Sequence, residues 1–147
     1  MTGSHFVLRP DQHARALNVV GTKVVVLASN AATQSYGITL QLGDAGTGPL
    51  PHSHDWDECF YVLQGGVEFL CDGNAQTCLE GTLVHVPRGT VHGFRFAAGG
   101  GRMLELTGQG ARAAEMFTAI DKEMPPGPPD VQRLLNVLSR NGVMAAV

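Results

Sequence analysis

Short segments rich in apolar and β-branched residues alternate with glycine- and proline-containing turns along most of the chain. No helical periodicity separates these segments, and short strands at such spacing are typical of antiparallel sandwiches and barrels. The pattern therefore predicts an all-β fold for the central part of the chain. The predicted strands are 17–20, 23–28, 36–42, 58–63, 67–71, 82–86, 91–96 and 103–107.

One pair of extended segments has the sequence of a β-hairpin. Asp72-Gly73-Asn74 stands between the strand at 67–71 and a further extended segment at 76–79. Gly73 can supply the positive φ that a tight hairpin turn requires. We therefore expect these two segments to pair as antiparallel neighbours.

The pattern becomes helical after Gly110. Helix-forming residues fill 111–120, where apolar side chains recur at three-residue steps, and a proline-rich run at 124–129 then interrupts the helix. Asp130 can cap a second short helix, which carries an apolar stripe and ends near Asn141. We expect both helices to pack on the outside of a barrel. The predicted regions are an N-terminal arm (1–16), a β-barrel (17–110) and a helical C-terminal extension (111–147).

Length and charge restrict the classes of protein to which the chain can belong. A chain of 147 residues fits one domain with a single core. Ten Lys and Arg stand against 13 Asp and Glu, without a basic run, which argues against nucleic-acid binding. The apolar runs are too short to cross a bilayer and the N-terminus lacks the layout of a secretory signal. We therefore expect a cytoplasmic protein without membrane contact.

The candidate chemistry is concentrated in four side chains of ligand type. His52 and His54 are two residues apart on an extended segment, so their rings project to the same side. Glu58 keeps this parity if the strand continues. His92 lies on a later predicted strand, whose alternate residues, His92, Phe94 and Phe96, are expected to face inward. Three imidazoles and one carboxylate directed at the interior of a barrel form a cage for a first-row divalent metal.

Two spaced motifs contain these side chains, and they resemble the paired signature motifs of the cupin superfamily. Phe96 stands where that family usually has an asparagine, which is not a metal ligand, so the departure implies only a more apolar pocket wall. The resemblance implies a double-stranded β-helix, or jelly-roll, barrel with short C-terminal helices. The matching positions are Gly46, His52, His54, Glu58 and Gly65 in the first motif and Gly81, Pro87, Gly89 and His92 in the second.

The same resemblance implies a cofactor. It assigns one divalent transition metal per chain to His52, His54, Glu58 and His92. Four protein ligands on an octahedral ion leave two positions open, which distinguishes a catalytic site from a closed structural one. The donor set suits Fe(II), Mn(II), Ni(II), Co(II) or Zn(II) and does not choose among them.

The proline-rich linker and terminal helix are similar to those of single-domain cupins described as quercetin-dioxygenase-like. This similarity implies an oxygenase that acts on a small enol- or phenol-bearing compound, with Glu58 also accepting the proton of the substrate. Two alternatives remain open. One is a redox-neutral isomerase, cyclase or lyase that uses the metal as a Lewis acid, and the other is a non-catalytic, metal-bearing module that binds a small ligand.

Several other residues are candidates for roles near the metal. Three phenylalanines share the parity of the ligands, and Tyr36 and Gln41 lie on the preceding strand, from which either could reach the pocket. His85 has the opposite parity, which predicts a structural histidine on the other face of its sheet. The residues predicted to line the substrate pocket are Phe60, Phe94, Phe96 and Tyr36.

The cysteines and the N-terminal arm bear on cross-linking and on assembly. Cys59, Cys71 and Cys78 are odd in number and lack CxxC spacing, which disfavours a disulfide framework or a zinc finger. The arm carries apolar residues at 6–8 with little local structure to bury them, and an exposed sheet edge invites strand addition. Cupins of this size resemble one another in forming dimers, so we expect a homodimer. We also expect the protein to bind a small-molecule substrate or ligand.

Overall fold

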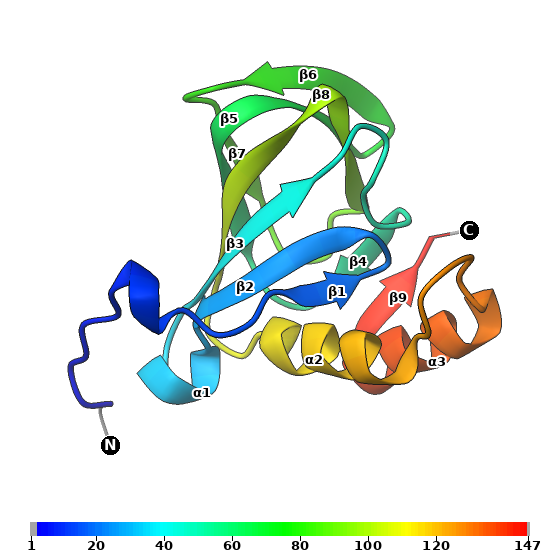
Figure 1. Ribbon diagram of the computed structural model, residues 1–147. Helices are drawn as coiled ribbons and strands as arrows, with labels where there is room; N and C mark the ends of the chain where they lie inside the picture. Colours follow the sequence, from blue (N-terminus) through cyan, green and yellow to red (C-terminus); the bar gives the residue numbers. More distant parts are fainter. Residues whose placement is uncertain (1–2, 147) are drawn as a thin grey trace.

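The computed structural model describes residues 3–146, and its strands curl into a barrel with helices across one end (Figure 1). The expected all-β jelly-roll barrel with short C-terminal helices is confirmed. In chain order the elements are η1 (Pro10–Gln12), β1 (Leu17–Val19), β2 (Thr22–Ala28), α1 (Asn30–Thr33), β3 (Gly37–Gly43), β4 (His52–His54), β5 (Glu58–Cys71), β6 (Asn74–Leu79), β7 (Leu83–Val86), β8 (His92–Thr107), α2 (Ala113–Glu123), α3 (Val131–Arg140) and β9 (Val143–Ala145).

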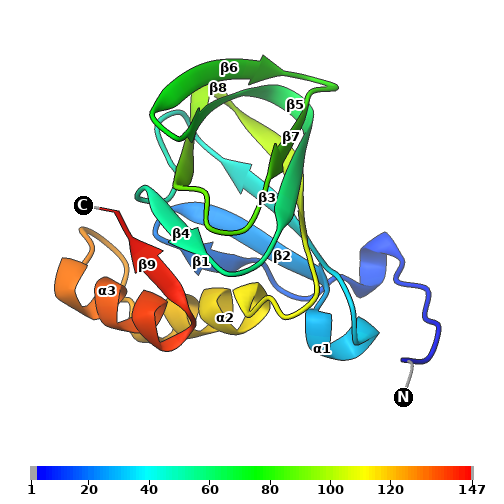
Figure 2. The ribbon, with the colours of Figure 1, turned by 180° about the vertical axis from the view of Figure 1, so that it is seen from behind.

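Two long strands, β5 and β8, hold the barrel together. The first part of β5 pairs with the last part of β8, where Glu58 lies opposite Thr107, and the end of β5 pairs with the start of β8, where Cys71 lies opposite His92. The strand order β1-β2-β3-β8-β4-β9 continues from β8, while β6 and β7 pair with β5. Each long strand therefore serves both walls of the barrel (Figures 1 and 2).

Glycines that the sequence suggests as turns instead lie within these long strands. Gly65 (φ +73°) and Gly100 (φ +75°) adopt left-handed backbone conformations that other residues disfavour. The register of β5 against β8 shifts on either side of Gly65, as at a β-bulge. The predicted strands at 58–63 and 67–71 are thus one bent strand, and so are those at 91–96 and 103–107.

The expected hairpin between β5 and β6 is present. Asp72 (φ +48°) and Gly73 (φ +82°) form the two-residue turn, and Cys71 pairs with Asn74 across its base. Positive φ at both central positions is the geometry of a type I′ turn, whose twist matches that of the flanking strands.

Apolar side chains form two separate cores. One fills the barrel and is built mainly from β5 and β8, with Phe60, Phe69, Phe94 and Phe96 in mutual ring contact. The other lies between the barrel and the helices, so α2 and α3 cover the end of the barrel below β1 and β2 (Figure 2). The helical side chains buried in this second core are Ala113, Met116, Phe117 and Ile120 of α2 and Leu134, Val137 and Leu138 of α3.

The second helix begins where the sequence predicts. The carboxylate of Asp130 accepts a hydrogen bond from the backbone N–H of Arg133 at 3.1 Å, as an N-cap does. The predicted apolar stripe is partly wrong, because Val131 at the start of the helix is 54% exposed while Val137 is buried. Over residues 3–146, none of the helices is both long and apolar enough to span a lipid bilayer.

Candidate metal centre

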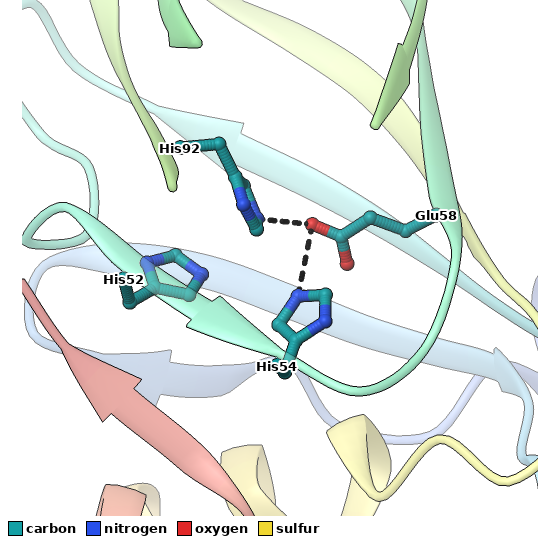
Figure 3. A group of neighbouring side chains, drawn as sticks. All are labelled: His52, His54, Glu58 and His92. Carbon is teal, nitrogen blue, oxygen red and sulfur yellow. Dashed lines mark hydrogen bonds and ion pairs between the residues drawn. The ribbon is translucent and has the colours of Figure 1, made fainter. Parts of the chain in front are cut away.

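The four predicted ligands come together at one end of the barrel interior (Figure 3). His52 and His54 lie on β4, while Glu58 and His92 are the first residues of β5 and β8. His52 and His92 are direct partners across the β4–β8 pair, which brings their ring centroids within 4.3 Å. One potential ligand atom from each of the four side chains lies within 4.8 Å of the others.

Local hydrogen bonds orient all three imidazole rings. Nδ1 of His52 lies 2.6 Å from the carbonyl oxygen of Leu50, Nδ1 of His54 lies 3.0 Å from that of Trp56, and Nδ1 of His92 lies 2.9 Å from that of Thr90. Because a carbonyl oxygen only accepts, each Nδ1 carries the donated proton. The Nε2 atoms of neutral rings then keep their lone pairs, which is the arrangement found in metal-binding histidines.

The donor set fits a divalent cation. Oε1 of Glu58 lies 2.6 Å from Nε2 of His92 and 3.4 Å from Nε2 of His54. With Nδ1 as its donor, a neutral His54 would present a lone pair to the carboxylate, and two facing acceptors are stabilised by a cation between them. The cluster could therefore hold a metal ion, and its nitrogen and oxygen donors match first-row divalent metals.

Electrostatics keep the carboxylate charged without a metal. Burial by itself would raise the pKa of Glu58, but the neighbouring imidazoles of His54 and His92 lower it to about 2. Burial would lower the pKa of His92, but its hydrogen bond to Glu58 raises it above the usual value. Burial, helped by the charge of His92, lowers the pKa of His52 to about 4. In the metal-free cluster a charged carboxylate thus lies beside a His92 that is protonated more readily, and a His52 that is protonated less readily, than a free histidine.

A cavity of about 190 Å³ opens beside the cluster and continues beneath the helices. This volume is below the ~300–1,000 Å³ of typical ligand pockets, so it suits a small molecule. Trp56 forms part of the wall, and its ring stacks on His54 with centroids 4.1 Å apart and planes 7° from parallel. The polar residues that line the cavity include Gln41, His52, His54, Glu58 and Glu105, and the apolar ones include Phe60, Phe94, Met116, Phe117, Leu134 and Leu138.

Two of the four residues predicted for the pocket do not reach it. Phe60 and Phe94 line the cavity, whereas Phe96 is buried in the barrel core, four residues along β8 from His92. At ~3.3 Å per residue, this places Phe96 a further ~13 Å along the strand. Tyr36 is 51% exposed and precedes β3, because the chain turns after the short helix α1 and strand parity does not extend to it.

One cavity residue, Glu105, was missed by the sequence analysis. It lies on β8 between the buried residues Met103 and Thr107, and all three face the interior. The alternation of the last predicted strand was a signal for this inward position, but no motif marked the residue. The apolar lining from α2 and α3 was also missed, because the helices were expected on the outside of the barrel.

The other titratable candidates lie away from the cluster. His85 is exposed on β7, on the opposite face to the buried Val86. The three cysteines are free, and burial raises the pKa of each thiol, which leaves them protonated and weakly nucleophilic.

Comparisons with known proteins agree with this fold and cluster. A family model described as "Cupin domain" matches residues 39–106. The solved structure of KdgF from Halomonas sp. is 20% identical with a TM-score of 0.68, and the match covers 76% of this chain and 99% of that one. An RmlC-like cupin from Shewanella frigidimarina is 19% identical with a TM-score of 0.68, over 78% of this chain and 99% of that one.

A third similar structure is the polyketide cyclase RemF from Streptomyces resistomycificus. It is 20% identical with a TM-score of 0.60, over 71% of this chain and 80% of that one. No protein with a curated description matches the sequence at a significant level. Sequence identities this low show a shared fold and do not show a shared reaction. The match of residues 39–106 to a cupin domain, the cupin-like fold and the clustered motif residues together support a single-domain cupin.

Proposed function

We propose that this protein is a metal-dependent enzyme that acts on a small compound with an enol or phenol oxygen, and that its reaction is an oxygenation. The observation that carries the proposal is the position of the ligand cluster, which borders a largely apolar cavity that continues beneath the helices. A purely structural metal site is closed by its ligands, whereas this one adjoins space for a further molecule.

His52, His54, Glu58 and His92 would hold the metal. Bound there, a divalent ion would supply Lewis acidity that lowers the pKa of a coordinated enol or phenol oxygen, and a redox-active ion would also permit reaction with dioxygen. The Nδ1 hydrogen bonds of the three histidines hold their rings in place before any ligand arrives.

Glu58 is the residue that would accept the proton of the substrate. Its carboxylate is ionised and buried, and one of its oxygens, Oε1, is held by His92 and His54. Phe60, Phe94 and Trp56 border the same cavity and keep bulk water away from the transfer. A general base in such a position typically accelerates a reaction by ~10²–10⁴-fold.

A redox-neutral reaction is the second candidate, and Glu105 favours it. This carboxyl group lines the same cavity as Glu58, and burial raises its pKa well above the usual value. A neutral acid and an ionised base in one site can move a proton from one atom of a substrate to another.

The test compares oxygen consumption with product formation. Protein loaded in turn with Fe(II), Mn(II), Ni(II) and Co(II) is given flavonols, catechols and β-diketones in an oxygen electrode, and products are identified by mass spectrometry. We expect uptake with at least one metal, and a loss of ~10²–10⁴-fold in Glu58→Gln at equal metal content. Glu68→Gln, an exposed change on the same strand, is the control and keeps the full rate.

Three other outcomes of this test would change the proposal. Equal uptake by wild type and Glu58→Gln at equal metal content would remove Glu58 as the base. Conversion to a product with the composition of the substrate, without oxygen uptake, would replace the oxygenase with the redox-neutral enzyme. Tight binding without any conversion would identify a ligand-binding module.

A further inference from the structure

A group of buried polar side chains lies on the inner wall of the barrel, where apolar residues are the rule. Thr39, Gln41 and Glu105 are 4%, 2% and 5% exposed. Thr39 and Glu105 are direct partners across the β3–β8 pair, and Glu105 lies opposite Phe60 on β5. Gln41 and Glu105 both line the cavity that adjoins the ligand cluster. The cavity therefore has a second polar region besides the ligands.

Two hydrogen bonds connect the three side chains of this group. Nε2 of Gln41 donates to Oγ1 of Thr39 at 3.3 Å, and Oγ1 of Thr39 donates to Oε1 of Glu105 at 3.1 Å. Thr39 has one hydroxyl proton and donates it to Glu105, so Oε1 of Glu105 acts as an acceptor. A proton carried by Glu105 would then lie on its other oxygen, Oε2.

The surroundings of Glu105 favour the protonated form of its carboxyl group. Over residues 3–146, no Lys, Arg or His lies within ion-pair distance of its carboxyl group. Burial raises its pKa well above the usual value, and the polar contacts with Thr39 and Gln41 offset this only in part. A buried carboxyl group without a cation is neutral in preference to charged, so Oε2 becomes a hydrogen-bond donor.

We propose that Glu105 is a substrate-binding residue, whose Oε2–H donates a hydrogen bond to a carbonyl oxygen of the compound that occupies the cavity. The inference rests on the proposed function, because it concerns the same cavity. It narrows the substrate to a compound with two oxygens, an enol hydroxyl for Glu58 and the ligand cluster and a carbonyl for Glu105. β-Diketones and hydroxyketones have this chemistry, and their apolar remainder would lie against Met116, Phe117 and Leu134.

Selectivity follows from the same arrangement. A site that holds a buried donor rejects a compound without the matching acceptor, because the donor would lose its partner on binding. Acetylacetone, a small β-diketone, carries both oxygens, whereas phenol carries only the ionisable one. The two compounds therefore separate the contribution of Glu105 from that of the metal ligands.

The first experiment measures binding of these two probes by calorimetry, with zinc-loaded protein so that no redox turnover occurs. Glu105→Leu removes the donor, and we expect acetylacetone to bind about tenfold more weakly, equivalent to ~1.4 kcal/mol, with little change for phenol. Glu105→Gln retains a donor and should bind acetylacetone nearly as wild type does. Met103→Leu, a buried change on the same face of β8, is the matched control, and zinc content is measured in every variant.

An infrared measurement tests the donor without turnover. The C=O stretch of a protonated carboxyl group should be present in metal-free wild type, absent in Glu105→Gln, and shifted to lower frequency when acetylacetone binds the zinc-loaded protein. Absence of a protonated band that belongs to Glu105 would overturn the inference. Equal weakening of acetylacetone and phenol in Glu105→Leu, or none for acetylacetone, would also overturn it.

If the proposed function is wrong, the binding experiment gives a result that differs from those that would overturn the inference about Glu105. If neither probe binds wild type, the proposed enol- or phenol-directed function loses its support. The infrared band still decides the state of Glu105 in that case, since it is recorded on the metal-free protein.

Discussion

Each histidine of the cluster takes its orientation from a carbonyl only two residues away in the sequence. Leu50, Trp56 and Thr90 accept the Nδ1 hydrogen bonds of His52, His54 and His92 respectively. The orientation of each ring therefore depends on backbone that is close to it in the sequence. Only the meeting of the Nε2 atoms with Glu58 depends on the assembled barrel.

Metal content is the most direct test at the level of residues. Wild type should bind about one divalent ion per chain, and His52→Ala combined with His54→Ala should abolish tight binding, because half of the donors are lost. His85→Ala, an exposed change on β7, should leave the metal content unchanged. Elemental analysis of protein purified without a metal-affinity column provides the measurement. Full occupancy in the double variant would contradict the assignment of the ligands.

The stability of the metal-free protein should depend on His52 in acid. Burial lowers the pKa of this ring from 6.5 to about 4, so between these values the unfolded chain binds a proton that the folded chain does not. The free energy of unfolding then rises with pH, by at most about 3 kcal/mol, and this contribution is complete above pH 6.5 and lost as the pH falls through 4. Urea unfolding of chelator-treated protein at several pH values should show a weaker pH dependence in His52→Gln. An identical dependence in both proteins would exclude this role.

Among the elements, β5 and β8 determine where the cluster can form. Both begin beside the cavity, with Glu58 and His92 as their first residues, and both bend at glycines that allow them to enter the opposite wall. The same bends separate the inward-facing residues into two groups. His92 and Phe94 face the cluster end, whereas Met103 and Glu105 face inward from the other wall.

Helix α2 has a structural contribution that a single substitution can measure. Ile120 is 2% exposed, lies in the core between the barrel and the helices, and lines the cavity. Ile120→Ala should lower the free energy of unfolding by about 2–5 kcal/mol, because it removes buried volume that the surroundings refill only in part. Lys122→Ala, an exposed change on the same helix, should stay within about 0.5 kcal/mol of wild type. Chemical denaturation that gives equal values for the two variants would contradict this packing.

For the whole molecule, the N-terminal arm is one of the exposed apolar features. Phe6, Val7 and Leu8 are 50%, 69% and 38% exposed, on a segment that runs away from the barrel (Figure 1). Arg15 at the end of the arm is anchored to Asp121 of α2, with Nη2 and Oδ2 2.7 Å apart. The arm is therefore anchored at Arg15, and its exposed apolar side chains are available for contact with a second copy.

A homodimer remains our prediction for the assembly. Light scattering should give about twice the chain mass of 15.5 kDa, and Phe6→Asp combined with Leu8→Asp should shift the protein to the monomer, because the charges oppose burial of the arm. Leu79→Asp, on the exposed strand β6, should leave the mass unchanged. A wild-type protein that stays at the monomer mass at micromolar concentration would refute the dimer.

Patterns within single strands were sufficient to predict much of this protein. Alternation placed His52 and His54 on one side, because side-chain direction in a strand is a local property of the backbone. The strand does not continue to Glu58, which begins β5, so Glu58 and His92 were predicted by the motif spacing and not by alternation. The Asp72-Gly73 turn and the cap at Asp130 could be predicted for the same reason, since each depends on residues that are neighbours in the sequence.

The remaining features depend on contacts between segments that are distant in the sequence. Phe96 shares the parity of the ligands but lies outside the pocket, because parity states which face a residue occupies and not how far along the barrel it lies. Glu105 joins the cavity through its pairing with Thr39, 66 residues away. The apolar cover from α2 and α3 likewise exists only once the helices fold back against the barrel. The sequence alone determined the donors of the cluster, and the tertiary structure decided which cavity they face, since a cavity is formed by walls that no single segment contains.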